Sequence, residues 1–322
     1  MEKQYVSDLK DGASVESVFS VKYKKPVRPY AKGFMFSVGL ADKTGEIELS
    51  YFGGRDNSKV ETVYNGFLEN DIVFVRGYAK EYHSRLSLSV NEDSGSIRKA
   101  DENESNPEFF LYTTNQDIDK MMGYLKSKID KVSNAYFKSL LGSFFDDTVF
   151  VEKFKRSPAA MYMHHACVGG LLEHTWGVLK ICETTHQLHP SLDYDLLVCG
   201  AVLHDIGKIE EFQMTSNIRI SEKGMLLGHI AIGADMILKK IEAIEGFPED
   251  LKNKAVHMIL SHHGELEYGA LKKPQFPEAA AVYMADLMDS QITQYIRFKK
   301  SNAERTEDFR GYSKYLGEIY LR

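Results

Sequence analysis

The sequence predicts a multi-domain protein in which a small β-barrel, residues 1–95, is followed through a linker, residues 96–108, by an all-α domain, residues 109–322. Three observations support this division. Short strand-like runs separated by turn signals fill the first part, whereas apolar residues at helical spacing fill the last part. Ten of the 11 histidines lie after residue 160. The chain of 322 residues is also long enough for two domains that each bury a core.

Four runs in the first part are typical of short strands, and the run 46–52 has the period of two that a half-buried strand requires. These runs are 33–40, 46–52, 71–78 and 85–90. The turn Asp42-Lys43-Thr44-Gly45 separates the first two runs, Gly53-Gly54 ends the second, and a helix-like stretch comes before the third. This order of strands and turns resembles that of an OB-fold, so we expect an OB-like barrel.

Residues 21–34, before the clear strands, interleave five cations with three aromatic residues. Cations meet phosphates and aromatic rings stack on bases, which is the chemistry of grooves that bind single-stranded RNA or DNA. The predicted nucleic-acid surface consists of Lys22, Tyr23, Lys24, Lys25, Arg28, Tyr30, Lys32, Phe34, Tyr51, Arg55, Tyr82 and Arg85. A solvated loop whose tyrosines pack locally is the alternative.

The pattern changes after the polar and acidic stretch 91–107, which we expect to be an exposed connection. Apolar residues then recur at helical spacing, and the apolar run 196–203 predicts a buried helix. This run leads directly into His204-Asp205. A buried carboxylate is costly unless it is paired or bound to a metal, so this dipeptide is a candidate site.

Other residues with metal-binding side chains lie in separate apolar stretches. His174 shares a helix face with Leu171 and Val178 and should point inward, and Asp286 interrupts the apolar stretch 279–288. His229 and His262-His263 lie in two further stretches. One such residue alone would be a satisfied core residue, but several in different helices are better explained by convergence on one site. Imidazole nitrogens and carboxylate oxygens suit a borderline divalent cation.

This order of histidines and aspartates resembles that of the HD-domain metal-dependent phosphohydrolases, which are all-helical. The neighbouring residues and the OB-like barrel resemble the YhaM-type 3′→5′ exoribonucleases over nearly the whole chain. The segments that carry this resemblance are 163–175, 204–208, 228–229 and 261–264. It implies a metal-dependent 3′→5′ exonuclease that hydrolyses single-stranded RNA, with single-stranded DNA as a further substrate, to 5′-mononucleotides by a metal-activated water.

The resemblance also implies two divalent cations. The implied ligands are His174, His204, Asp205 and Asp286 for the first cation, and Asp205 as a bridge with His229 and His262 for the second. Histidines with only two carboxylates favour Mn, with Fe, Co, Ni or Zn as alternatives, over Mg.

Three further residues are candidate catalytic groups. Lys208 would contact the substrate phosphate, and an exposed lysine at a helix end is the alternative. His165 would contact phosphate or donate a proton to the leaving oxygen, or it is a core histidine. His263 would be a metal ligand, the hydrogen-bond partner of a metal ligand, or a hydrogen-bond donor to the substrate phosphate. Asp289, one helical turn beyond Asp286, is either the partner of a ligand or a surface carboxylate.

Two other functions remain compatible with the sequence. One is an HD phosphohydrolase of small or cyclic nucleotides, which the basic and aromatic stretch 21–34 disfavours. The other is a non-catalytic nucleic-acid binder with a degenerate HD domain, which the full set of ligands disfavours.

The overall composition, with 43% hydrophobic and 27% charged residues, is typical of a globular protein. The N-terminus lacks the pattern of a signal peptide, and no apolar run approaches the roughly 18 residues of a membrane span. The three cysteines form no CxxC motif. We therefore expect a cytoplasmic protein without a membrane partner.

The polar and aromatic stretch 297–322 fits either the assembly surface of a homo-oligomer or a simple terminal helix.

Overall fold

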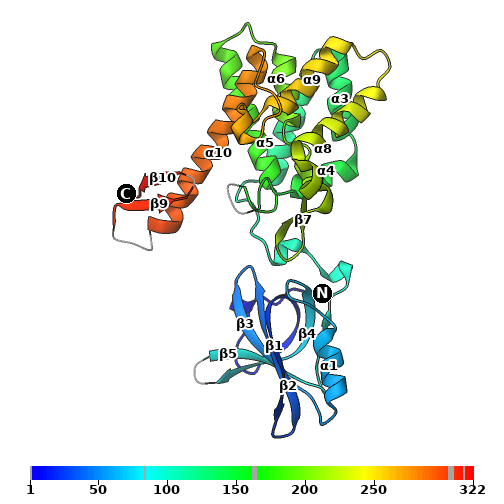
Figure 1. The fold of residues 1–322 in the computed structure, drawn as a ribbon, viewed down its shortest axis with the longest axis vertical. Coiled ribbons are helices and arrows are strands. Elements are labelled where there is room, and N and C mark those ends of the chain that lie inside the picture. Colours follow the sequence, from blue (N-terminus) through cyan, green and yellow to red (C-terminus); the bar gives the residue numbers. More distant parts are fainter. Residues whose placement is uncertain (1, 83–84, 162–164, 304–307, 315) are drawn as a thin grey trace. The chain divides into compact units, whose positions relative to one another are not determined.

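The computed structural model describes residues 2–82, 85–161, 165–303, 308–314 and 316–322. The chain divides into two compact units. The first contains Met1–Tyr112 and Met214–Ile218, and the second contains Thr113–Gln213 and Arg219–Arg322. The predicted class, an OB-like barrel followed by a helical domain, is confirmed (Figure 1).

The first unit is built on one sheet with the strand order β1-β2-β3-β5-β4-β6. Its elements are β1 (Ser14–Tyr30), β2 (Gly33–Asp42), β3 (Gly45–Phe52), α1 (Asn57–Asn65), β4 (Ile72–Tyr82), β5 (Arg85–Asn91) and β6 (Ser96–Lys99). Because β1 also pairs with β4, the sheet closes into a barrel. The four predicted strands correspond to β2, β3, β4 and β5.

Two strands of the barrel were not expected. The stretch 21–34, placed before the first clear strand, belongs largely to β1. Register shifts between Val21 and Tyr23 and between Lys25 and Arg28 break its alternation, which hid the strand. β6 lies within the predicted linker and buries Ile97 against the barrel core. Four residues with one apolar side chain are too short to produce a recognisable period.

The second unit is predominantly helical. Its helices are α2 (Ile118–Ile129), α3 (Ala135–Phe145), α4 (Thr148–Arg156), α5 (Gly170–Leu188), α6 (Tyr194–Leu203), α7 (Lys208–Glu211), α8 (Glu222–Glu242), α9 (Glu249–Ser261) and α10 (Pro277–Ala303). α6 is the predicted buried helix, and all its residues from Leu196 to Leu203 are buried. Asp193 caps its first turn by accepting from the N–H of Leu196. Helix α6 therefore carries His204 and Asp205 into the interior.

Two short hairpins interrupt the all-α expectation, namely β7 (Phe212–Met214) with β8 (Ile218–Ile220), and β9 (Arg310–Ser313) with β10 (Gly317–Tyr320). The second hairpin shows that the C-terminal stretch is more than a terminal helix.

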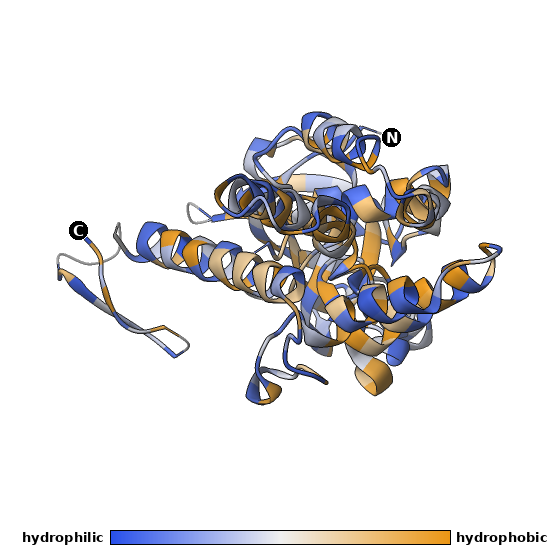
Figure 2. Cartoon of the chain, turned by 90° about the horizontal axis from the view of Figure 1, so that it is seen from above, coloured by the Kyte–Doolittle hydropathy of each residue, from blue (hydrophilic) through white to orange (hydrophobic). Residues whose placement is uncertain are grey.

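The long helix α10, which leads to this hairpin, carries hydrophobic residues along its exposed length (Figure 2), including Met284, Met288, Ile292 and Ile296. Among the helices that the structure describes, none combines the length and apolar character of a membrane span.

Candidate metal centre

Five helices bring the predicted ligands to one place. His174 lies on α5, His204 and Asp205 follow α6, His229 lies on α8, His262 and His263 follow α9, and Asp286 lies on α10. One glycine permits the approach of two of these elements. A Cβ on Gly207 would stand 2.0 Å from the carbonyl oxygen of His229, so only glycine lets the turn after Asp205 pack against α8.

Three donors form a first group, His174, His204 and Asp286. The Nε2 atom of His174 lies 3.2 Å from Nε2 of His204 and 3.2 Å from Oδ1 of Asp286. Oδ2 of Asp205 lies 3.4 Å from each of these two nitrogens. The four residues predicted to hold the first cation therefore lie together.

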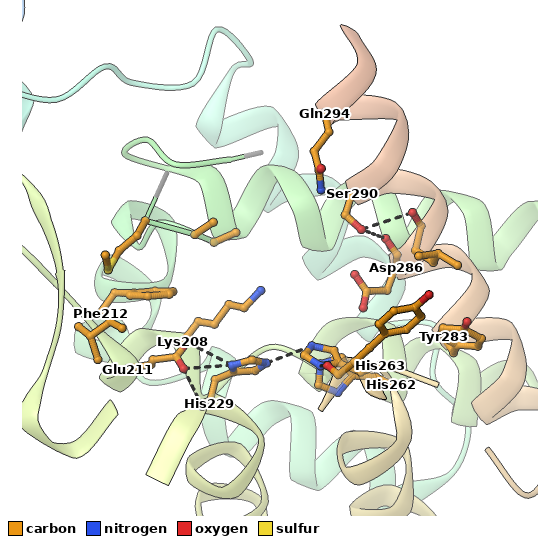
Figure 3. Close-up of a pocket in the computed structure, with 16 residues that line it drawn as sticks. Lys208, Glu211, Phe212, His229, His262, His263, Tyr283, Asp286, Ser290 and Gln294 are labelled. Atoms are coloured by element: carbon orange, nitrogen blue, oxygen red, sulfur yellow. Dashed lines mark hydrogen bonds and ion pairs between the residues drawn. The ribbon is translucent and has the colours of Figure 1, made fainter. Parts of the chain in front are cut away.

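Three histidines form a second group, His229, His262 and His263. Nε2 of His229 lies 3.4 Å from Nε2 of His263 (Figure 3). Oδ1 of Asp205 lies 3.6 Å from Nε2 of His229 and 3.5 Å from Nε2 of His262. Asp205 thus presents one oxygen to each group, as a bridging ligand would.

Hydrogen bonds at Nδ1 determine that Nε2 faces the centre in three of the histidine rings. The Nδ1 atoms of His204, His262 and His263 lie 2.9, 2.7 and 2.9 Å from the backbone carbonyl oxygens of Ala201, Ile259 and Tyr268. Because a carbonyl oxygen only accepts, these Nδ1 atoms carry the hydrogen. In the neutral ring, Nε2 then offers the lone pair that a metal ligand needs.

Two buried atoms at the centre, Oδ1 of Asp205 and Nε2 of His262, have no hydrogen-bond partner within the described residues. An unpaired buried polar atom costs about 1–3 kcal/mol. A cation would satisfy both atoms, and the donor set of imidazoles and carboxylates suits a borderline divalent ion. The residues present therefore fit a metal centre.

The charge states at the centre match these roles. Burial would raise the pKa of the Asp205 carboxyl, but Lys208 and His204 hold it well below its ordinary value. Burial lowers the pKa values of His262 and His263, so both rings are neutral at pH 7, as metal ligands must be.

His174 differs from these two histidines. Burial would lower its pKa, but the carboxylates of Asp205, Asp286 and Asp289 outweigh burial and raise it well above its ordinary value. A proton and a cation cannot both occupy Nε2 of this ring. Cation binding at His174 therefore competes with protonation and weakens as the pH falls.

Lys208 lies beside the bridging carboxylate. Its Nζ atom is 2.6 Å from Oδ2 of Asp205, and its side chain is 11% exposed. Burial would lower the pKa of Lys208, but Asp205 and Asp286 raise it, so the ammonium stays charged. The alternative of an exposed lysine at a helix end is wrong, because the helix packs this side chain toward Asp205.

A cavity of about 650 Å³ opens onto the ligands. Its lining includes Lys208, His229, His262, His263 and Asp286 (Figure 3). Aromatic and polar residues that were not predicted complete the wall, namely Phe212, Tyr268, Tyr283, Ser290 and Gln294. The cavity is large enough for a small polar ligand to reach both donor groups.

His165 is not among the described residues that line this cavity. It is 3% exposed, and its Nε2 atom lies 3.1 Å from Oδ2 of Asp289. The same Asp289 oxygen lies 2.7 Å from Nδ1 of His174. Asp289 is therefore the hydrogen-bond partner of His174, one of the predicted metal ligands, and not a surface carboxylate. A role for His165 as a proton donor stays a prediction, and its burial favours the core-histidine alternative.

The predicted nucleic-acid surface of the barrel divides into exposed and engaged residues. The exposed ones are Lys22, Tyr23, Lys25, Arg28, Lys32, Arg55, Tyr82 and Arg85, whereas Tyr30 and Phe34 are half-buried. Nζ of Lys24 donates to the carbonyl oxygen of Phe67 at 2.6 Å and lies over the Tyr64 ring, so it is tied to the barrel.

One residue of that surface is wrongly predicted. Tyr51 is 4% exposed and stacks on Phe36 with ring centroids 4.8 Å apart. It shares the parity of Ile47 and Leu49 in β3, so its ring points into the barrel core and cannot stack on a base. The parity of the strand was the signal that could have shown this.

Sequence reasoning also missed Glu211, whose carboxylate lies 3.1 Å from Nδ1 of His229. Glu211 follows Lys208 by three residues, but its partner is 18 residues away in the sequence. No local pattern reports such a contact.

Comparisons with known proteins agree with this geometry. The family model described as HD domain matches residues 171–290, which include the ligands from His174 to Asp286. The 3'-5' exoribonuclease YhaM of Bacillus velezensis is 30% identical over 285 residues, which is 87% of this chain and 86% of that protein. The protein of the same name from Bacillus licheniformis is 31% identical over 259 residues, covering 80% of this chain and 79% of the relative.

Among solved structures, the second OB-fold domain of replication protein A from Methanococcus maripaludis is similar over 31% of this chain and 97% of that chain. The sequence identity is 23% and the TM-score is 0.26, which is too low to add to the strand order as evidence of the fold. The two YhaM relatives cover both the barrel and the helical domain. The chain belongs to the family of YhaM 3'-5' exoribonucleases.

Proposed function

We propose that the protein is a metal-dependent 3′→5′ exonuclease that hydrolyses single-stranded RNA, and single-stranded DNA as a further substrate, to 5′-mononucleotides. The observation that carries this proposal is the meeting of the two donor groups at the Asp205 carboxylate, whose Oδ1 atom has no hydrogen-bond partner within the described residues. Asp286 of the first group and the three histidines of the second group line one cavity beside it. The substrate and the direction of cutting are supported by the relatives, which are named 3'-5' exoribonucleases.

The centre is proposed to hold two divalent cations, Mn in the first place, with Fe, Co, Ni or Zn as alternatives. His174, His204, Asp205 and Asp286 would hold the first cation, and Asp205, His229, His262 and His263 the second. When bound, such cations lower the pKa of a water molecule and offset the charge that builds up on phosphate oxygens. The third histidine of the second group supports the assignment of His263 as a ligand.

The remaining side chains of the cavity bind and orient the substrate. The Lys208 ammonium can donate to a non-bridging phosphate oxygen while it keeps Asp205 ionised. The rings of Phe212 and Tyr283 form parts of the wall on which a terminal base can lie. In the barrel, the exposed rings of Tyr23 and Tyr82 and the neighbouring cations support binding of a single strand.

The test uses one RNA oligonucleotide labelled in turn at its 5′ and 3′ ends, incubated with the full chain and Mn²⁺ or EDTA. We expect a ladder from the 5′-labelled strand, immediate release of labelled mononucleotide from the 3′-labelled strand, and neither in EDTA. An RNA that stays intact with Mn²⁺, while cyclic or small nucleotides are hydrolysed, would support the alternative phosphohydrolase instead.

Cellular location and assembly are further proposals. A cytoplasmic location is supported by three buried cysteines that form no disulfide. A homo-oligomer is supported by the exposed apolar residues of α10.

A further inference from the structure

Glu211 holds His229 at both the backbone and the ring. It is the last residue of α7, and its side chain is 13% exposed. The backbone N–H of His229 donates to Oε1 of Glu211 at 3.0 Å. Nδ1 of the His229 ring lies 3.2 Å from Oε1 and 3.1 Å from Oε2 of the same carboxylate. Figure 3 shows Glu211 beside the ring of His229, on the side away from His263.

The local backbone explains why His229 needs this partner. Gly228 has φ 70° and ψ 158°, values that interrupt α8 directly before His229. The first N–H groups of a helical segment have no acceptor within the helix, and Glu211 supplies one.

Glu211 is itself fixed in place. Its carbonyl oxygen accepts from the N–H of Ser221 at 2.8 Å, and a Cβ on Gly224 would stand only 2.4 Å from that oxygen. The carboxylate is therefore presented from a tightly packed backbone rather than from a mobile loop. A ligand that is oriented by such a rigid support loses little freedom when it binds a cation.

The three histidines of the second donor group differ in the group that lies beside their Nδ1 atom. His262 and His263 are oriented by backbone carbonyls, whereas His229 is oriented by a carboxylate. A carboxylate behind a ligating imidazole fixes the tautomer with hydrogen on Nδ1 and makes Nε2 more basic. Nε2 of His229 then faces Asp205 and His263 as a lone pair.

We propose that Glu211 is a positioning residue that sets the affinity of the second donor group for its cation by orienting His229. This inference rests on the proposed metal centre, but not on the identity of the substrate. Loss of such an outer carboxylate typically costs about 10- to 100-fold in metal affinity.

The test measures Mn²⁺ binding to the full, metal-stripped chain by isothermal titration calorimetry. In Glu211→Ala we expect one of two binding events to weaken about 10- to 100-fold while the other is unchanged. Glu211→Gln keeps an acceptor for the His229 N–H groups and should lose less, and it serves where the alanine variant folds poorly. The matched control is Glu210→Ala, because Glu210 is the adjacent carboxylate, half-exposed and paired with Lys223.

A double-mutant cycle distinguishes positioning from a merely structural role. If Glu211 acts through His229, adding Glu211→Ala to His229→Ala has no further effect on Mn²⁺ affinity. Equal losses in both backgrounds, or an unchanged affinity in Glu211→Ala, would overturn the inference while the metal centre stands. Two intact binding events in His229→Ala would instead overturn the second cation site itself, and the inference with it.

Discussion

Two buried lysine–aspartate pairs, one in each domain, differ in how completely they are satisfied. In the barrel, Nζ of Lys3 lies 3.1 Å from Oδ2 of Asp42, and the side chains are 3% and 0% exposed. In the helical domain, Nζ of Lys208 lies 2.6 Å from Oδ2 of Asp205, and the side chains are 11% and 2% exposed. Burial alone does not separate these two pairs.

The two pairs differ in the hydrogen bonds of the Oδ1 atom, the carboxylate oxygen that does not contact the lysine. Oδ1 of Asp42 accepts from the N–H and the hydroxyl of Thr44, and its Oδ2 also accepts from the N–H of Val6. Oδ1 of Asp205 has no hydrogen-bond partner in the part of the chain that the structure describes. A fully bonded carboxylate stabilises the fold, whereas a buried oxygen left open indicates a place for a ligand.

The largest expected effect comes from Asp205→Asn. This change removes the negative charge shared by both donor groups, and we expect the Mn²⁺-dependent activity on RNA to fall by at least about 10³-fold, as several kcal/mol of charge stabilisation are lost. Metal-free stability should fall less than in Asp42→Asn, because the charges of Asp286 and Glu211 still act on the Lys208 ammonium. Activity assays and urea unfolding of the same preparations check both parts. Near-normal activity in this variant would show that Asp205 is not a ligand of the metal centre.

Asp42→Asn is expected to show the opposite pattern. The change leaves Lys3 without its charged partner in a buried site, which should cost the barrel about 3 kcal/mol, with metal affinity unchanged. Equilibrium unfolding in urea measures the loss. An unchanged midpoint would mean that the barrel does not depend on this pair.

The same pair predicts a dependence on pH. Burial would raise the pKa of Asp42, but hydrogen bonds from Thr44 and Val6 and the charge of Lys3 lower it. Because the folded pKa is below the unfolded value of about 3.9, the stabilisation is present above that value and is lost as the pH falls below about 4. The difference in stability between wild type and Asp42→Asn should therefore shrink between pH 5 and the acid limit of the measurement (about pH 2).

The smallest effect is expected for a more exposed pair, between Arg98 of β6 and Glu104 of the segment that follows β6. Arg98 donates two hydrogen bonds to Glu104, of 2.8 and 2.9 Å, but the Arg98 side chain is 46% exposed. The hydrogen bonds from Arg98 lower the pKa of Glu104 to about 2. Solvent screens this pair, so Glu104→Gln should cost only about 0.5 kcal/mol at pH 7, and nothing at a pH below the folded value. A loss as large as that of Asp42→Asn would contradict the distinction between exposed and buried pairs.

Local patterns were sufficient for much of the fold. Short strand-like runs between turn signals identified β2 to β5, and the apolar run before His204 identified α6 as a buried helix. β1 and β6 escaped because register shifts hide the period in one and the other has only four residues. Periodicity reports which face of a segment is buried only while the segment is regular and long enough.

The sequence by itself determined which residues are able to bind metal, because His, Asp and an apolar context can be read from each segment alone. Only the tertiary structure decided how these residues cooperate. His165 and Asp289 are 124 residues apart, and Glu211 and His229 lie on different helices. Contacts between separate helices depend on how the helices pack, and no periodicity within a single helix records that packing.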